Sequence, residues 1–226
     1  MAIAEIQVLD KGYVKYVRHM GDDLSPVEDA RMSTGNVTGI DVKKDDALRA
    51  YLWKNGHSSP FDGCILTVEM KVPIFVLRQM DRHRTLDVND TTIEGYDDFR
   101  KYTSRNEFSG RYSEFPEFYL PELTDLQAQS KTNNQGSEGV LDVTIRENFR
   151  FFLNSYNQAT FEEYLDSLEA GLAREKARFL VMNNVYTKIR ITANLVNWFK
   201  FLKLRLDYHA QYEVRVYAEA ISKIIK

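Results

Sequence analysis

Residues 63–73, GCILTVEMKVP, constrain the fold more than any other segment, because their apolar and polar positions alternate. The apolar side of this pattern is made by Cys64, Leu66, Val68 and Met70. Alternation with a period of two predicts a β-strand with one buried face, so Cys64 is expected to be a buried structural cysteine. Pro73 ends the strand and can open a helix over residues 74–84, IFVLRQMDRHR. A chain that combines strands and helices in this way is expected to be of the α+β class.

Further strands and helices are predicted along the rest of the chain. Residues 5–18 are expected to form a hairpin that turns at Asp10-Lys11-Gly12, and residues 184–192 a strand rich in β-branched side chains. Helices are expected to begin at Ser25 and after Asp41, and a long helix is expected from about 143 to 169, before Gly171. The next helix should carry Arg174, Arg178 and Val181. Helical structure should then fill the remainder to Lys226, with a break near Asp207. Residues 124–139 are polar and aperiodic, which predicts a surface loop. Because no repeat or linker divides the chain, residues 1–226 are expected to form a single domain.

The composition limits the class of protein. With 226 residues and a net charge of −3, the chain lacks the broad basic surface that nucleic-acid binding requires, so any anion site must be a local cluster. One cysteine allows no internal disulfide, which suits a reducing compartment. No run approaches the roughly 18 apolar residues of a membrane span, and the N-terminus has no signal-peptide pattern. We therefore expect a cytoplasmic protein that binds neither nucleic acid nor membrane.

Two polar, basic clusters are candidates for an anion site, Arg82-His83-Arg84 and Ser109-Gly110-Arg111-Tyr112. Arginine suits phosphate because its planar guanidinium can give two parallel hydrogen bonds and keeps its charge. Glycine permits close backbone approach, and serine adds a hydroxyl donor. Arginines on helices are more often simply solvated, and the helix face shared by Gln79, Arg82 and His83 could equally cover a subunit contact. The four histidines, His19, His57, His83 and His209, show no metal-ligand spacing.

Several segments, in order along the chain, carry a resemblance to a known family. They are VLDKGYV at 8–14, NGHSSPFDG at 55–63, PIFVLRQMDRHR at 73–84, SGRYS at 109–113, REKARFLVMNNVYTK at 174–188 and LRLDYHAQYE at 204–213. In all of them the chain resembles the flavin-dependent thymidylate synthases, whose signature is RHR, seven residues and then a serine. The resemblance covers nearly the whole chain. It implies the fold of that family, a single domain with a small, mostly antiparallel sheet and several long helices.

The resemblance also implies an activity, the methylation of dUMP to dTMP. In that family methylene-tetrahydrofolate supplies the carbon, FAD carries the hydride and NADPH reduces the flavin, in homotetramers whose active sites are shared between subunits. A flavin leaves the protein to supply mainly orientation and electrostatics, which agrees with a sequence that contains no activated cysteine. The alternative from another class is a non-catalytic homo-oligomer of the same fold that binds nucleotides through the same arginines.

The same resemblance implies site residues. Those implied for dUMP are Gln79, Arg82, Glu107, Ser109, Gly110, Arg111, Arg178 and Arg205. Those implied for FAD are Ser59, Arg82, His83, Arg84, Thr85, Glu107, Asn194 and Lys200, with His57 near the folate and the nucleotide. Arg205 would be the catalytic residue, because a guanidinium beside the uracil favours negative charge on the ring. Its alternative role is an ion pair with Asp207 or Glu213. Ser109 is expected to bind substrate rather than attack it, because no base is near it in the sequence.

The chain departs from the family pattern at three positions and in one length. Asp62 replaces a glutamate, Val196 an arginine and Lys200 an asparagine. Lys200 could restore the charge lost at Val196, because positions i and i+4 share a helix face. The gap between RHR and Ser109 holds 24 residues instead of seven, an excess of 24 − 7 = 17. We place the insertion at about 85–101, where the charge is 2 − 5 = −3, and expect a peripheral flap over the site or a subunit boundary.

Overall fold

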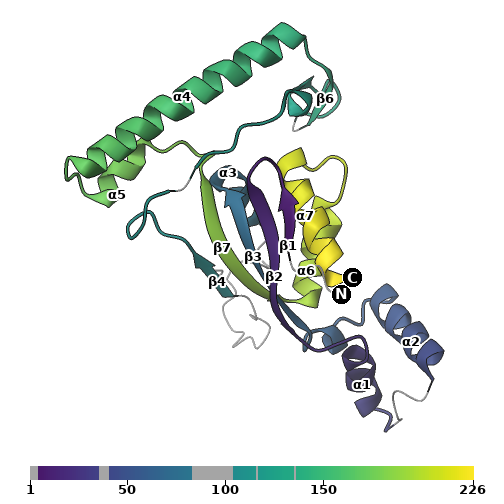
Figure 1. The fold of residues 1–226 in the computed structure, drawn as a ribbon. Helices are drawn as coiled ribbons and strands as arrows, with labels where there is room; N and C mark the ends of the chain where they lie inside the picture. Colours follow the sequence, from purple (N-terminus) through teal and green to yellow (C-terminus); the bar gives the residue numbers. More distant parts are fainter. Residues whose placement is uncertain (1–4, 36–40, 83–103, 116, 135) are drawn as a thin grey trace.

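The computed structural model describes residues 5–35, 41–82, 104–115, 117–134 and 136–226 (Figure 1). Its centre is an antiparallel five-stranded sheet in the order β1-β2-β3-β7-β4. These strands are β1 Glu5–Val8, β2 Gly12–Met20, β3 Ile65–Pro73, β4 Ser104–Glu107 and β7 Tyr186–Asn194. The predicted α+β class is confirmed, together with the first hairpin and the two long strands β3 and β7.

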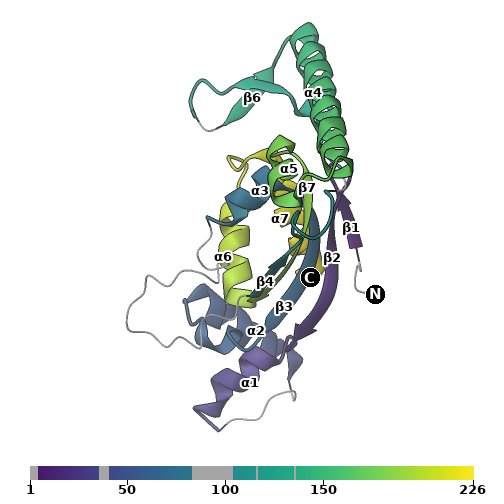
Figure 2. The ribbon, with the colours of Figure 1, turned by 90° about the vertical axis from the view of Figure 1, so that its left-hand side faces the viewer.

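The described helices are α1 Ser25–Met32, α2 Val42–Lys54, α3 Ile74–Met80, α4 Val143–Glu169, α5 Arg174–Ala177, α6 Leu195–Arg205 and α7 Tyr212–Ile225. The helices α3, α6 and α7 pack on one face of the sheet and enclose the core, as Figure 2 shows. Alternate residues of β3, from Leu66 to Val72, are buried in this core, as the alternation predicts. Cys64, just before β3, is also buried. The opposite face of the sheet is polar, where Glu69 pairs with Arg190 at 2.6 Å.

The helices α1 and α2 form a separate pair at the lower end of the sheet in Figure 1. They begin near the predicted positions, at Ser25 and after Asp41, whose carboxylate caps α2 by accepting the backbone N–H of Lys44 at 3.3 Å. A buried ion pair between Arg31 and Asp45, at 2.6 Å, joins the two helices. The buried residues of α2 are Asp45, which makes this ion pair, and Leu52 near the end of the helix.

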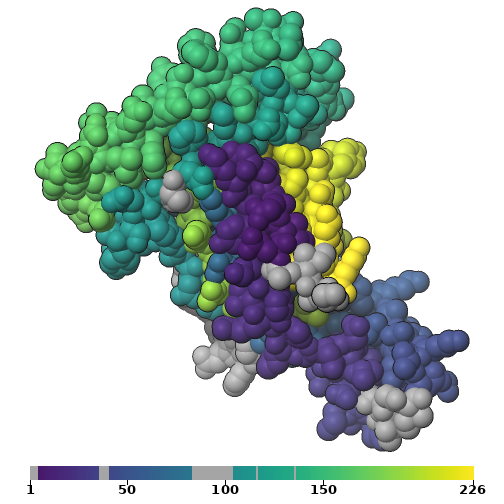
Figure 3. Space-filling view, in the orientation of Figure 1, coloured from purple at the N-terminus to yellow at the C-terminus, as the bar shows by residue number. Residues whose placement is uncertain are grey.

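The opposite end of the molecule is crossed by the 27-residue helix α4, whose bounds match the prediction (Figure 3). Residues 124–139, expected to be a loop, instead contain a short hairpin of β5 (Gln127–Gln129) and β6 (Ser137–Val140). Its turn is held by polar side chains: Ser130 Oγ accepts the N–H of Asn133 at 3.1 Å, and Gln129 Nε2 donates to the Gly136 carbonyl at 2.9 Å. Because amides and hydroxyls rather than an apolar face hold this hairpin, no strand pattern marks it in the sequence.

Two helices are shorter than predicted. The helix expected over 74–84 ends at Met80, and Asp81 and Arg82 form a turn after it. The helix expected to reach Val181 is the short α5 followed by a 3₁₀ turn at Arg178–Leu180. After this turn the backbone leaves the helical conformation, because the carbonyls of Asn183 and Val185 accept hydrogen bonds from the first backbone N–H groups of α3. The predicted break near Asp207 is confirmed between α6 and α7. Among the described residues, no helix combines the length and the apolar character of a membrane span.

Candidate functional site

The end of α3 and the strand β4 lie side by side, although Asp81 and Arg105 are 24 positions apart in the sequence (105 − 81 = 24). Asp81 forms the C-cap of α3, and its carboxylate pairs with the guanidinium of Arg105 in β4. Arg78, one turn earlier on α3, also reaches Asp81 at 3.4 Å. Arg82 and the Ser109 segment therefore lie close in sequence to the two partners of one ion pair. The segment 83–103, with His83, Arg84, Thr85 and the insertion at 85–101, lies outside the described residues.

Gln79 on α3 meets the ends of two other helices. Arg205, the last residue of α6, donates to the Gln79 backbone carbonyl at 3.4 Å. The Gln79 side-chain amide contacts that of Gln211, the N-cap of α7, and Gln211 donates in turn to Glu213 at 2.8 Å. Two segments far apart in the sequence, residues 73–84 and 204–213, each a motif of the resemblance, thus meet at one place.

Arg205 is half-buried at this convergence, and burial lowers the pKa of its guanidinium below the ordinary value. A desolvated cation acts more strongly on a nearby developing charge than a solvated one. The Asp207 carboxylate accepts the backbone N–H of His209 at 2.9 Å and contacts its Nδ1 at 2.8 Å, and the alternative role of Arg205, an ion pair with Asp207 or Glu213, stays a prediction.

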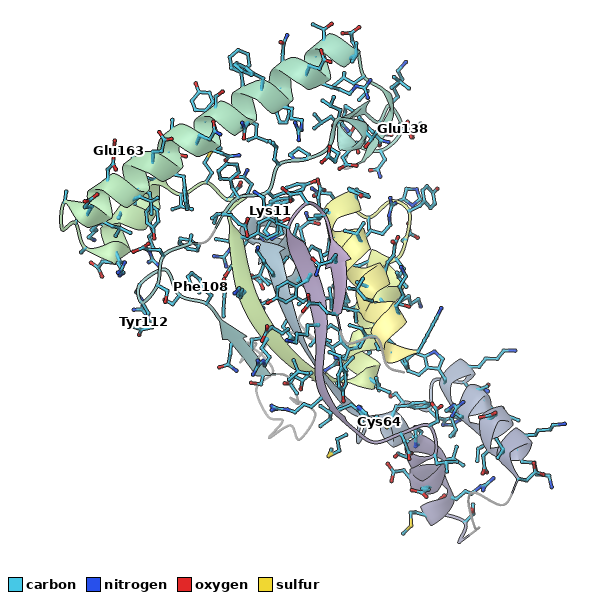
Figure 4. All side chains as sticks on the ribbon, in the orientation of Figure 1. Lys11, Cys64, Phe108, Tyr112, Glu138 and Glu163 are labelled. Carbon is cyan, nitrogen blue, oxygen red and sulfur yellow. The ribbon has the colours of Figure 1, made fainter. Side chains whose placement is uncertain are left out.

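The segment after β4 forms a tight turn. The carbonyl of Ser109 accepts the backbone N–H groups of Tyr112 at 3.0 Å and Ser113 at 3.2 Å, and its hydroxyl accepts the N–H of Arg111 at 3.3 Å. Gly110 is buried, and a Cβ there would lie 2.5 Å from the ring of Phe115, so the turn requires glycine. Arg111 stays exposed over the Tyr112 ring, on the loop labelled in Figure 4.

Glu107 closes β4 at the start of this turn. Its carboxylate accepts the Thr187 hydroxyl of β7 at 3.3 Å. The surrounding protein displaces enough water to raise the pKa of Glu107, while Arg78 and Arg105 act in the opposite direction. Arg178, exposed at the junction of α5 and its 3₁₀ turn, lies beside the end of α4 rather than in these contacts.

The residues implied for FAD fall into two groups. Ser59, Arg82 and Lys200 are exposed donors. Asn194 is buried, and both ends of its amide are used within the chain: it caps α6 at the Asn197 N–H at 2.9 Å and donates to Asp62 at 3.0 Å.

The departures from the family pattern lie on the same part of the chain. Val196 is buried with Leu52 and Phe61, so this position is a packing contact in this chain. One helical turn later, Lys200 emerges at the surface. His57 is exposed beside the Tyr51 ring, with 6.3 Å between ring centroids.

Some site features are not visible in the motifs alone. The contacts of Asp81 with Arg105 and of Glu107 with Thr187 join segments whose proximity only the sheet register defines. One available signal was an acidic residue, Asp81, placed inside the basic run RQMDRHR, since such a charge usually has a partner.

A family profile and individual relatives all point to the same group of proteins. A profile of the family described as "Thymidylate synthase complementing protein" matches residues 15–226. The chain is 42% identical over 222 residues to a flavin-dependent thymidylate synthase of Thermus thermophilus, covering 98% of this chain and 74% of the relative. It is 39% identical over 224 residues to the enzyme of that name from Kosmotoga olearia, covering 98% and 88%.

A solved structure with a similar fold is the UMP/dUMP methylase PolB from Streptomyces cacaoi bound with 5-Br dUMP. It superposes with a TM-score of 0.78 at 28% identity, covering 96% of this chain and 90% of that chain.

Proposed function

Because the chain belongs to the family of flavin-dependent thymidylate synthases, we propose that it converts dUMP to dTMP with methylene-tetrahydrofolate as carbon donor, FAD as hydride carrier and NADPH as reductant. The observation that carries this proposal is the meeting of two motifs far apart in the sequence, with Gln79 in the first and Arg205 and Gln211 in the second. Such a convergence is expected of a shared ligand site, because residues that act on one molecule must meet in space.

The nucleotide would lie between this convergence and the turn after β4. The turn at Ser109 and Gly110, with Arg111 and Arg178, offers hydroxyl, backbone and guanidinium donors for the phosphate. Arg205 would face the uracil and stabilise negative charge on the ring. Ser109 is proposed as a binding residue, since its hydroxyl accepts the Arg111 N–H and contacts no histidine or carboxylate within the described part of the chain.

The exposed donors fit a flavin dinucleotide in part. Arg82 and Lys200 are cations suited to its diphosphate, and Ser59 adds a hydroxyl. Asn194 would act by holding the start of α6 beside Asp62, because its own amide is already used. His83, Arg84 and Thr85 remain proposals outside the described residues. When bound, FAD would supply the hydride chemistry, and the protein would orient the nucleotide and exclude water.

We also propose a homotetramer with shared active sites. The exposed side of α4 carries a row of large apolar residues, Ile145, Phe149, Phe152 and Tyr156. Their spacing of four, three and four positions puts them on one helix face. A row of this kind on a surface marks a protein contact, and a second copy of the chain is the partner that a homo-oligomer offers.

Two further expectations remain proposals. Residues 1–226 would form one domain with the insertion at about 85–101 as a peripheral addition, because loops of this length cost little closure entropy. A cytoplasmic location is supported by the single cysteine, Cys64, which is free and buried.

The test combines a spectrum with an assay. Purified protein mixed with FAD is expected to become yellow and retain the flavin through gel filtration. With methylene-tetrahydrofolate and NADPH, it should release tritium from dUMP labelled at C5. Flavin retention and dUMP binding without tritium release would favour the non-catalytic nucleotide-binding homo-oligomer, and the loss of all three would reject the proposed function.

A further inference from the structure

We propose that the ion pair between Asp81 and Arg105 is a positioning pair that holds the two ends of the nucleotide site in register. This inference rests on the proposed function, because the site it positions is the proposed dUMP site. Neither residue belongs to the set that the resemblance implies for substrate or flavin. Both would act through their neighbours.

The position of each partner supports this role. Asp81 ends α3 directly after Gln79 and Met80, and immediately before Arg82. Arg105 is the second residue of β4, two positions before Glu107 and four before Ser109. The ion pair is therefore a side-chain link between the two segments that carry most of the proposed dUMP residues.

The strand β4 needs such a link. It has only four residues and, among the residues that the structure describes, lies at the edge of the sheet with β7 as its one neighbouring strand. Short edge strands are weakly held, because half of their backbone groups have no strand partner. A displacement of β4 would carry Glu107 and the turn at Ser109 with it, and misplacement by about 1 Å can cost up to a hundredfold in rate or affinity.

Both charged side chains of the ion pair are largely shielded from solvent. The side chains of Arg105 and Asp81 are only 16% and 24% exposed. Arg78 gives Asp81 a second cation at 3.4 Å but is itself 74% exposed, so it is the weaker partner. If Asp81 is neutralised, Arg105 loses the carboxylate with which it pairs in the described part of the chain, and its poorly solvated guanidinium is expected to move towards water.

The test measures dUMP binding to the folded full chain by calorimetry. We expect Asp81→Asn and Arg105→Gln each to raise the Kd for dUMP about tenfold. The double variant should bind no worse than either single variant, because removing both charges leaves none unpaired. In turnover, the KM for dUMP should rise while kcat changes by less than about twofold, since binding rather than chemistry is affected.

Matched controls separate positioning from stability. Glu114→Gln removes the ion pair of Glu114 with Arg174, at 3.4 Å, on the far side of the same loop, and should leave the Kd unchanged. If Asp81→Asn fails to fold, Arg105→Lys carries the test, since it keeps the charge but loses the planar fork, and an increase of about two- to fivefold is expected.

The outcomes distinguish this inference from the proposed function. A wild-type protein that binds no dUMP overturns both. If the wild type binds dUMP and the folded single variants bind it equally well, only the positioning pair is rejected. The same holds if the effects of the two substitutions multiply in the double variant, because independent effects would mean that the residues do not act as a pair.

Discussion

Arg205 is a partly buried cation at a point where two helices meet. It is the last residue of α6, it is half-buried, and its guanidinium donates to the backbone of Gln79. A cation in this place can stabilise charge only where it is held, so its effect depends on both its charge and its geometry.

Replacing Arg205 by alanine should therefore reduce turnover more than stability. We expect kcat/KM for dUMP to fall by about 10²–10³, as for other preorganised electrostatic groups, while the circular dichroism spectrum and the oligomer size stay the same. Lys203→Ala, an exposed neighbour on the same helix, is the control and should keep full turnover. Unchanged turnover in Arg205→Ala would remove this residue from its catalytic role.

Glu107 is a second residue whose environment makes a prediction, because the surrounding protein raises its pKa above the ordinary 4.5. Below pH 4.5 the carboxyl is protonated in both folded and unfolded chains and carries no penalty. As the pH rises, the unfolded chain ionises first, so the folded state loses stability until the folded pKa is passed. The cost is therefore fully present at neutral pH.

Because Glu107 is exposed, solvent screens much of this cost, so Glu107→Gln should raise Tm only slightly at pH 7 and leave it nearly unchanged at pH 4. The same variant should weaken dUMP binding if Glu107 contacts the nucleotide. Glu163→Gln, at an exposed position on α4 labelled in Figure 4, serves as the control and should shift Tm at neither pH. An equal Tm shift of Glu107→Gln at both pH values would show that ionisation of the Glu107 carboxyl does not destabilise the folded state.

At the scale of elements, the sequence predicts those that rest on apolar periodicity. The strand β3, the strand β7 and the helix α4 follow from alternation or helical spacing and are confirmed. The strand β4 and the hairpin of β5 and β6 are short and polar, and only pairing with distant or adjacent backbone makes them strands. Their stability comes from tertiary context, which a local pattern does not contain.

The candidate site divides in the same way. Motifs identify Gln79, Arg205 and the turn at Ser109, because a motif is defined by residue type and order, and the sequence contains both. The use of the Asn194 amide inside the chain and the burial of Val196 were not predictable, since both depend on how α2 and the 3₁₀ turn at Ser59–Phe61 pack on α6. Packing partners of this kind are set by the whole fold.

The helices α1 and α2 are joined by a buried ion pair, Arg31 with Asp45, and by apolar packing of Ala30, Leu48 and Leu52. Asp45 is 2% exposed, and Asp45→Asn would leave Arg31 opposite a neutral group. We expect a loss of about 3 kcal/mol in unfolding free energy, the lower end for broken buried pairs because Arg31 is partly solvated. Urea denaturation measures this loss, and hydrogen exchange should show it concentrated in α1 and α2.

Asp46→Asn provides the matched control one residue away. Asp46 pairs with Arg49 at 2.9 Å but is 57% exposed. Its loss should cost less than about 1 kcal/mol, as for other surface ion pairs. Equal effects of the two substitutions would show that burial of the Asp45 pair does not hold the helices together.

At the scale of the whole molecule, the proposed site residues and the apolar row of α4 are both left open to solvent in a single copy. Arg82, Arg111, Arg178 and Lys200 are exposed, and they come from elements on different parts of the surface. A bound flavin and nucleotide need enclosure to exclude water. Assembly of several copies would cover the apolar row and could enclose the site in the same step.

Introducing charged residues into the apolar row of α4 tests whether assembly and activity are linked. Phe149→Glu with Phe152→Glu should reduce the proposed tetramer to smaller species in sedimentation experiments, because two carboxylates would have to be buried in the contact. If active sites are shared, tritium release from dUMP should fall in proportion to the lost tetramer and recover partly at high protein concentration. Val143→Glu is the control: Val143 is 50% exposed, lies two positions before Ile145 and therefore on the opposite face of α4, and should leave the proposed tetramer intact. A charged row that still forms tetramers would place the subunit contact elsewhere, and a fully active smaller species would reject shared sites.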